Sequence, residues 1–572
     1  MKRKSFILVL AFVLIATLVF AGGEKEEETL ITTAPGEPQY GGTFTYTYWS
    51  ITKADPPSPD IQDELYISTR WLNPVQEMPL IADFEKYGPR GTGESPFTMA
   101  GYIPDKFIKG QLLESWEVTP QKITWHVRPG IYWAADNVDW MENRELTAQD
   151  MVDDILYFKG ADSKGKFLRD LTGEIYATDK YTLVIETPGG FDITLMYKIG
   201  YEDRALISPP EMVVAGADKW ENQVGTGPFM FKEYVVGSHM TFERNPNYWD
   251  TTIINGVEYQ MPFFDEWVQP IIPDESTLVA ALRTGKVDYG YSIDARHWET
   301  LDTTAPELKS LKHPGSSGFL IFLKVDEPPL DNIDVRRALM IGTDLKAFGD
   351  LLGIGPVPKL FYPVLPGTGG VFTPVEDLPA SSRELFDYNP TLAKQMIADV
   401  YPDGLEIDYY AESEAFALDQ ASLLKFQWEK IGVDVTIKSF DTVTHDKHLY
   451  DRTYNNTLGA RHGSADPKHT LEWSVTGDAR NWAGYSNEWY DEQMALVKAE
   501  PDADERNRIL KEMNLLIISE ALTIGISPTP EGHYWWPWVK NYYGETCVLD
   551  KAVAPILARA WLDQDLKATM GY

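Results

Sequence analysis

The chain has 572 residues, of which 43% are apolar, and this is enough material for two or three hydrophobic cores. Its 51 Lys and Arg residues against 86 Asp and Glu residues give a formal net charge of −35, which argues against nucleic acid and anionic lipid as partners. The single cysteine, Cys547, excludes an internal disulfide and a metal site built from several cysteines.

The N-terminal segment predicts export. Lys2-Arg3-Lys4 precede an apolar run from Phe6 to Phe20, and Val19-Phe20-Ala21 suits the cleavage site of a secretory signal peptide. The run is shorter than the roughly 20 residues of a membrane-spanning helix, although an uncleaved anchor is the alternative. No cysteine stands at the cleavage point, so a lipid anchor cannot be attached there. We therefore expect a signal peptide at 1–21 and a soluble protein, not a lipoprotein, in the periplasm or outside the cell.

After this segment the chain alternates between strand and helix patterns. Residues 22–39 are acidic and contain Pro and Gly, which predicts a disordered leader. Residues 40–49 alternate as a strand, and Thr147 is placed to cap a helix with Asp150 as its capping-box partner. Residues 270–288 predict a strand and then a helix that ends at Gly285. This alternation is of the α/β type.

Several segments carry a recognisable pattern. Residues 224–234 (VGTGPFMFKEY) and 242–249 (FERNPNYW) combine a Gly-Pro loop with an Arg-Asn-Pro turn, which predicts a hairpin. Further blocks lie at 111–118 (QLLESWEV), 328–339 (PPLDNIDVRRAL) and 427–437 (QWEKIGVDVTI). In residue types and in order, these segments resemble the family 5 extracellular solute-binding proteins, the ligand-capturing subunits of ABC importers for peptides, oligosaccharides and nickel.

The resemblance implies the domain organisation and the general function. It implies the α/β fold of the type II periplasmic-binding proteins, in the large family 5 form, with two lobes joined by hinge strands and an extra inserted domain. By analogy, lobe I comprises 40–65, 185–275 and 520–572, domain II comprises 66–184, and lobe II comprises 276–519. We expect a monomer that closes on a small-molecule ligand by hinge motion and delivers it to an inner-membrane ABC permease, without a cofactor.

One loop departs from the peptide-binding members of this family. Those members carry an aspartate four residues before a proline, where it pairs with the N-terminal ammonium of the peptide. Counted back from Pro467, that position is Gly463, while Asp466 matches the acidic residue beside the proline. An ammonium buried without its carboxylate would be strongly unfavourable. The sequence therefore favours an uncharged ligand, above all an oligosaccharide. A di- or oligopeptide-binding protein is the alternative, and it requires a carboxylate elsewhere in the cleft.

Aromatic side chains supply the candidate ligand contacts. The chain has 18 Trp residues, and a flat ring offers a platform to the C–H face of a sugar. For any one of these rings, a place in the core is the alternative. The candidate ligand-binding residues are the rings Tyr48, Trp49, Trp71, Trp473 and Trp482 and the hydrogen-bond donors Arg461, His462 and Asn481.

The chain also contains patterns that superficially suggest a metal site or catalysis. His445 and His448 lie one helical turn apart, with His462 and His469 downstream, but without a Glu-containing zinc motif they are more typical of core or surface histidines. The glycine spacing at 315–318 is wrong for a nucleophile elbow. We therefore expect no enzyme and no metal site, with a carboxylate-dependent hydrolase and a chaperone-like protein as the remaining alternatives.

Overall fold

A computed structural model describes most of the chain in two units, Met1–Glu37 and Pro38–Tyr572, and everything below concerns the second. The signal peptide expected at 1–21 lies outside the described residues, as do Tyr48 and Trp49. The described residues are 36–47, 56, 58–63, 71–99, 102–202, 205–352, 358–548 and 552–572.

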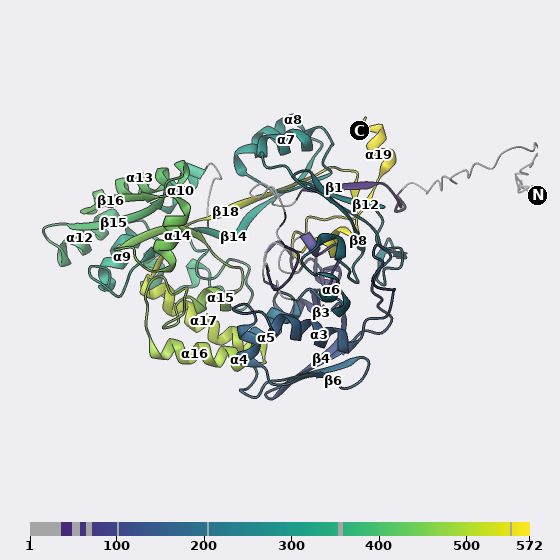
Figure 1. The fold of residues 1–572 in the computed structure, drawn as a ribbon. Coiled ribbons are helices and arrows are strands. Elements are labelled where there is room, and N and C mark those ends of the chain that lie inside the picture. Colours follow the sequence, from purple (N-terminus) through teal and green to yellow (C-terminus); the bar gives the residue numbers. More distant parts are fainter. Residues whose placement is uncertain are drawn as a thin grey trace, which may run out of the picture. The chain divides into compact units, whose positions relative to one another are not determined.

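A ten-stranded mixed sheet organises the second unit (Figure 1). Its central strands, β14 and β18, are 15 and 13 residues long and pair antiparallel. They run from the parallel strands β15–β17 at one end to β13 at the other, so they connect the two halves of the sheet. In spatial order the strands are β16 (Val433–Phe440), β15 (Leu405–Glu412), β17 (Thr457–His462), β14 (Lys309–Leu323), β18 (Thr523–Trp535), β13 (Tyr289–Ile293), β1 (Thr43–Thr47), β12 (Glu266–Pro270), β9 (His239–Arg244) and β8 (Phe229–Val235).

The local signals in the sequence explain several of these elements. Phe44 and Tyr46 are buried and alternate with the less buried Thr43 and Thr45, so the strand predicted at 40–49 forms as β1 over the described residues. The predicted hairpin is confirmed, because β8 and β9 pair antiparallel from Phe229 opposite Arg244 to Val235 opposite His239. The predicted helix before Gly285 is also confirmed, and Gly285 takes a φ of +66° just past its end.

A separate four-stranded sheet, with order β4-β5-β7-β6, lies near α3. The predicted capping box of α3 is confirmed: Thr147 Oγ1 accepts from the Asp150 N–H, and Asp150 Oδ2 accepts from the Thr147 N–H at 2.8 Å. The elements of this region are β4 (Leu113–Thr119), β5 (Lys122–Val127), α3 (Ala148–Lys159), α4 (Lys166–Leu171), β6 (Ile175–Ala177), β7 (Thr182–Glu186), α5 (Ile193–Gly200) and α6 (Pro210–Ala215).

The remaining helices lie mainly around the two ends of the large sheet, and short two-stranded pairs complete the fold. The helices are α2 (Phe84–Tyr87), α7 (Glu275–Arg283), α8 (Trp298–Thr304), α9 (Ile333–Ile341), α10 (Leu345–Leu352), α11 (Ala380–Arg383), α12 (Pro390–Val400), α13 (Ala415–Lys430), α14 (Thr442–Tyr450), α15 (Pro467–Glu472), α16 (Glu488–Ala499), α17 (Ala503–Glu520), α18 (Ala554–Leu557) and α19 (Gln564–Thr569). The short strands are β2 (Leu80–Ala82), β3 (Ile108–Gly110), β10 (Thr251–Ile254), β11 (Val257–Gln260), β19 (Val539–Lys540) and β20 (Trp561–Leu562).

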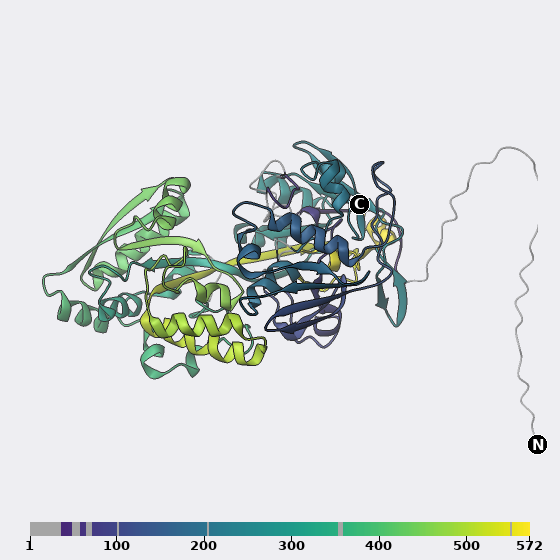
Figure 2. The ribbon, with the colours of Figure 1, turned by 60° about the horizontal axis from the view of Figure 1, so that its bottom comes forward.

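The hydrophobic cores follow the two halves of the sheet. One large core draws on residues between 44 and 301 and again between 534 and 562. A second, around β15, β16 and α13, draws on residues between 321 and 526. Across this division, α16 contacts α5 (Figures 1 and 2). Among the described helices none is long and apolar enough to cross a membrane.

Candidate ligand-binding site

A cavity of about 580 Å³ lies between the central strands and segments from both halves of the unit. This volume is in the range that proteins use to hold small-molecule ligands. Its walls come from residues 94–99 and 102–107, from 313–316 on β14, from the stretch 358–370, from the start of α17 and from Pro528 on β18, with Cys547 also at its wall. Cys547 is buried.

The strand wall of the cavity is irregular, for a reason visible in the sequence. Pro314 lies opposite Pro530, and Gly318 lies opposite Pro528. Between these two pairs β14 advances by four residues while β18 advances by two. Prolines cannot donate to the ladder, and the extra residues of β14 form a bulge. This bulge carries Gly315 and Ser316 to the cavity.

Most of the cavity wall is apolar, with charged groups at a few points. The apolar side chains include Phe97, Met99, Tyr102, Phe107, Phe361 and Leu365. The carboxylates at the wall are Glu94, Asp105 and Asp504. Such a wall suits a ligand with apolar groups and a small number of fixed charges.

The three carboxylates differ in what they already bind. Glu94 pairs with Lys106 at 3.0 Å, and this hydrogen bond lowers the pKa of Glu94. Asp105 accepts from the Tyr197 hydroxyl at 3.0 Å and pairs with Arg506. The carboxylate of Asp504, in the first turn of α17, makes no hydrogen bond or ion pair within the described part of the chain. Asp504 is therefore available to a ligand.

Two polar contacts join segments that are far apart in sequence. Arg506, only 3% exposed on α17, binds Asp105 across 401 positions of the chain. Lys468 on α15 donates to the Thr194 hydroxyl of α5 at 3.1 Å. Both contacts link residues of predicted lobe II with residues outside it, and Asp105 lies at the cavity wall.

The expectation of exposed stacking rings is wrong for Trp71, Trp473 and Trp482, which are 6%, 6% and 2% exposed. Trp473 and Trp482 pack on each other with ring centroids 5.1 Å apart, and the ring centroid of His462 lies 4.5 Å from that of Trp482. The loop after β17 folds back on the sheet, so these rings bury their apolar surface in a core. Trp71 belongs to the other large core.

The three predicted hydrogen-bond donors lie in different surroundings. The Asn481 amide donates to the carbonyls of Val475 and Tyr485 and accepts from the amides of Gly484 and Tyr485, so this buried side chain is fully engaged in its own loop. Burial lowers the pKa of His462 to about 4, so it is neutral at neutral pH. Arg461 is exposed on β17 and lines a second cavity of about 190 Å³.

Among the predicted site residues that the structure describes, none lines the 580 Å³ cavity. The structure brings His462, Trp473 and Trp482 together, but in a core. The residues that sequence reasoning missed, such as Asp105 and Asp504, lie in segments without a distinctive motif. A usable signal was the Pro- and Gly-rich run 363–370 (PVLPGTGG), which is typical of a loop that approaches a ligand.

The backbone at Gly463 explains why the expected aspartate is missing there. Gly463 has a φ of +151°, and a Cβ at this position would lie 2.8 Å from the carbonyl oxygen of Ser316 and 2.9 Å from Cα of Ser317. The end of β17 therefore packs directly on the bulge of β14, and any side chain at this position would collide with it.

Comparison with known proteins identifies a family model and relatives that are similar to this chain. The chain matches the family model "Bacterial extracellular solute-binding proteins, family 5 Middle" over residues 108–482, well over half its length. It is 24% identical over 468 residues to Heme-binding protein A of Haemophilus influenzae, covering 76% of this chain and 81% of that protein. It is 22% identical over 448 residues to the Dipeptide-binding protein of Escherichia coli, covering 72% and 79%.

Solved structures show the same fold. The periplasmic binding protein DppA of Helicobacter pylori, in complex with the peptide STSA, superposes with a TM-score of 0.66 at 18% identity, covering 92% of this chain and 99% of that one. A putative peptide-binding protein AppA of Clostridium difficile gives a TM-score of 0.70 at 16% identity, covering 91% and 100%. These likenesses confirm the predicted α/β fold of the two-lobed periplasmic-binding proteins. The chain belongs to the family 5 bacterial extracellular solute-binding proteins.

Proposed function

We propose that this protein captures a short peptide between its two lobes and delivers it to the permease of an ABC importer. The observation that carries the proposal is Asp504, a carboxylate at the wall of the 580 Å³ cavity that has no ion-pair partner among the described residues. A peptide-binding protein without an aspartate at position 463 requires a carboxylate elsewhere in the cleft, and Asp504 meets that requirement. It would receive the N-terminal ammonium of the peptide as a charge-assisted hydrogen bond.

The earlier expectation of an oligosaccharide loses its support. It depended on the missing aspartate at Gly463 and on exposed rings. Asp504 offers another carboxylate at the cavity wall, and Trp71, Trp473 and Trp482 are buried in hydrophobic cores. Relatives also point toward peptides: the Escherichia coli relative is named a dipeptide-binding protein, and the Helicobacter pylori structure contains a peptide. The mixed wall of the cavity suits side chains of varied type, with Phe361 and Leu365 among its apolar groups.

Closure of the lobes is the mechanism that these two polar contacts support. Arg506 with Asp105 and Lys468 with Thr194 link residues of predicted lobe II with residues outside it, while β14 and β18 are the strands that a hinge motion would bend. A ligand that contacts both sides binds the closed form better than the open one. It therefore shifts the population toward the closed form, which the permease would recognise.

The location, the oligomeric state and the domain boundaries complete the proposal. We propose that residues 1–21 are removed on export, that the mature protein is monomeric in the periplasm or outside the cell, and that its lobes have the boundaries given by analogy above. N-terminal sequencing of the exported form tests the first point. Recovery of a membrane-bound form that retains Met1 would contradict it.

The role of Asp504 is tested by titration calorimetry with tri- to pentapeptides that carry a free or an N-acetylated amino terminus. Asp504→Asn removes the charge but keeps the shape of the side chain, so binding of free peptides should weaken by about tenfold to a hundredfold, the equivalent of one charge-assisted hydrogen bond. Binding of the acetylated peptides should not change between the two proteins.

A matched control exists on the same helix. Glu512→Gln removes one carboxylate of α17 that pairs with Arg508 at 2.7 Å on the exposed side, away from the cavity. It should leave peptide affinity unchanged. Equal effects of the two substitutions, or no effect of Asp504→Asn, would show that Asp504 does not receive the ammonium.

A further inference from the structure

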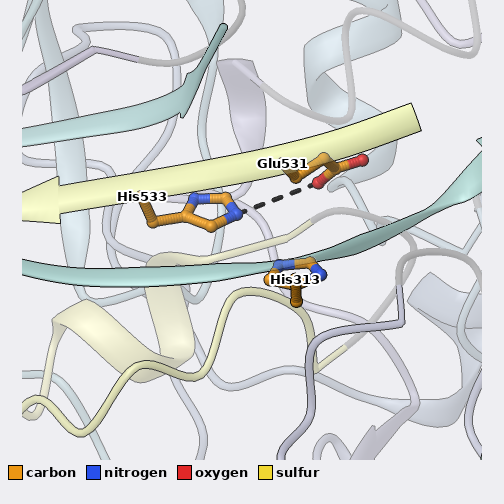
Figure 3. Close-up of side chains that lie close together, drawn as sticks. All are labelled: His313, Glu531 and His533. Atoms are coloured by element: carbon orange, nitrogen blue, oxygen red, sulfur yellow. Dashed lines mark ion pairs between the residues drawn. The ribbon is translucent and has the colours of Figure 1, made fainter. Parts of the chain in front are cut away.

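Three side chains of the kinds that bind metal ions meet on the two central strands. His313 lies on β14, directly opposite Glu531 on β18, and His533 is two residues further along β18. Because side chains alternate between the faces of a strand, this register places all three on the same face. Figure 3 shows them side by side, and their ligand atoms all lie within 4.8 Å of one another.

The hydrogen bonding of His313 leaves one nitrogen ready to bind a cation. Nδ1 lies 2.9 Å from the carbonyl oxygen of Pro314, and a carbonyl only accepts, so Nδ1 carries the proton. Nε2 then presents a lone pair, and this buried atom has no hydrogen-bond partner among the described residues. The neutral ring can therefore offer Nε2 to a metal ion.

His533 offers a second nitrogen. The side chain is fully buried, and its Nε2 has no hydrogen-bond partner in the described part of the chain, although Glu531 Oε2 lies 3.8 Å away. In its neutral form this ring can offer Nε2 as a metal ligand.

The proton of His533 can sit on the nitrogen that faces away from the cluster. Nδ1 lies 3.2 Å from the Tyr289 hydroxyl, which contacts the Tyr542 hydroxyl, and Tyr542 donates to the carbonyl of Glu545. That carbonyl only accepts, so a chain of donors from His533 through the two tyrosines ends there and leaves Nε2 unprotonated. The Ser292 N–H also approaches Nδ1, at 3.4 Å, and this long contact would be given up.

Ring orientation sets what must move for binding. The rings of His313 and His533 are stacked, with centroids 5.2 Å apart and planes 9° apart, whereas one ion bound by both needs to lie in both ring planes. His313 borders the cavity and is only partly buried, so its ring can rotate toward the ion and give up its contact with the Pro314 carbonyl, while His533 is enclosed.

We propose that His313, Glu531 and His533 bind a divalent transition-metal ion, best matched by Zn²⁺, at the wall of the ligand cavity. Two imidazole nitrogens and one carboxylate form a set that suits zinc and leaves a fourth position open, whereas Ca²⁺ and Mg²⁺ prefer oxygen ligands alone. Because His313 borders the cavity, the open position faces the space where a ligand would lie. The ion would also tie β14 to β18 beside the bulge. None of this depends on the peptide assignment.

The proposal is tested on the whole protein, purified without a polyhistidine tag, stripped of metal with a chelator and titrated with zinc chloride in the absence of peptide. We expect one equivalent to bind and the melting temperature to rise. His313→Ala and Glu531→Gln each remove one ligand at a partly buried position, and each should weaken binding by at least about tenfold. Co²⁺ in place of Zn²⁺ should give the visible absorption of a nitrogen- and oxygen-bound ion, and His313→Ala should abolish it.

The chain provides a matched control in a second histidine cluster. His445 lies with Glu412 and Asp446 within the same 4.8 Å limit, on the far side of β17 from β18. His445→Asn should leave zinc binding unchanged. Absence of zinc binding to the wild-type protein, unchanged binding in both His313→Ala and Glu531→Gln, or loss confined to His445→Asn would overturn the proposal. Melting curves of each variant without metal report whether it has folded.

Discussion

Two fully buried carboxylates show how differently the same group can be held. Glu77 takes two hydrogen bonds on each oxygen: Gln111 and Tyr248 donate to Oε1, and Thr226 and Trp249 donate to Oε2. Asp154 takes two on Oδ1 alone, from the backbone and the hydroxyl of Ser208. Burial raises the pKa of each to about 7.

The raised pKa of Asp154 makes stability depend on pH. Between pH 3.8 and about 7 the folded protein keeps a proton on Asp154 that the unfolded chain has lost, so stability from this group is full below pH 3.8 and falls as pH rises toward 7. Asp154→Asn keeps an oxygen for Ser208 and removes the buried charge. We expect it to raise the melting temperature at pH 8 and to flatten the slope between pH 4 and pH 7. A slope equal to that of the wild type would contradict this account.

Glu77→Gln should act in the opposite direction. Trp249 and the Gln111 amide are obligatory donors, one on each oxygen, so the NH₂ group of a glutamine would face one of them. The donor left without a partner costs about 1–3 kcal/mol. Thermal melts at pH 8 should show destabilisation of Glu77→Gln and stabilisation of Asp154→Asn. Two variants of equal stability would show that the number of oxygens engaged does not decide the outcome.

At the scale of elements, the strands and helices with strong local signals could be predicted from the sequence. The hairpin of β8 and β9, the capping box at Thr147 and the helix before Gly285 depend on residues close together in the chain. The burial of Trp473 and Trp482 does not. It depends on how the loop after β17 folds back over the sheet, and an aromatic residue in a loop gives the same local signal whether it is exposed or packed.

The candidate site was harder to predict for the same reason. Its wall joins segments near residues 97, 314, 365 and 504, which no periodic pattern connects. The register of β14 with β18 brings His313 opposite Glu531 across 218 positions, and sequence spacing carries no information on that pairing. Residues close together in the chain determine the helices and strands, whereas packing between distant segments determines the cavity wall.

The close packing of β17 on the bulge of β14 gives an element-scale prediction. Gly463→Ala places a methyl group 2.8 Å from the Ser316 carbonyl oxygen on a backbone with φ of +151°. We expect destabilisation of about 1–3 kcal/mol from this strained backbone, measured by thermal melting. Gly477→Ala is the control, since its φ of +79° is also positive but nothing lies within 4 Å of the added Cβ. An equal loss in both variants would mean that contact with the bulge contributes nothing.

At the scale of the whole molecule, the contact between Arg506 and Asp105 should hold the lobes closed. Arg506→Met keeps much of the side-chain length but removes the charge, so the open form should gain population and peptide affinity should fall. Small-angle scattering should give a larger radius of gyration for this variant without ligand. Arg508→Met lies on the same helix, and among the described residues Arg508 pairs with Glu505 and Glu512 alone, so this variant should behave as the wild type. The same radius in all three proteins would remove Arg506 from the closing mechanism.

Capture of a peptide in the cavity beside β14 and β18 is the central claim about this protein, and ligand class tests it most directly. The measurement is titration calorimetry of the purified wild-type protein against a series of di- to pentapeptides and a series of β-linked oligosaccharides of similar size. We predict saturable one-to-one binding of peptides and no heat of binding from the sugars. Saturable binding of an oligosaccharide, with no peptide bound, would contradict the account.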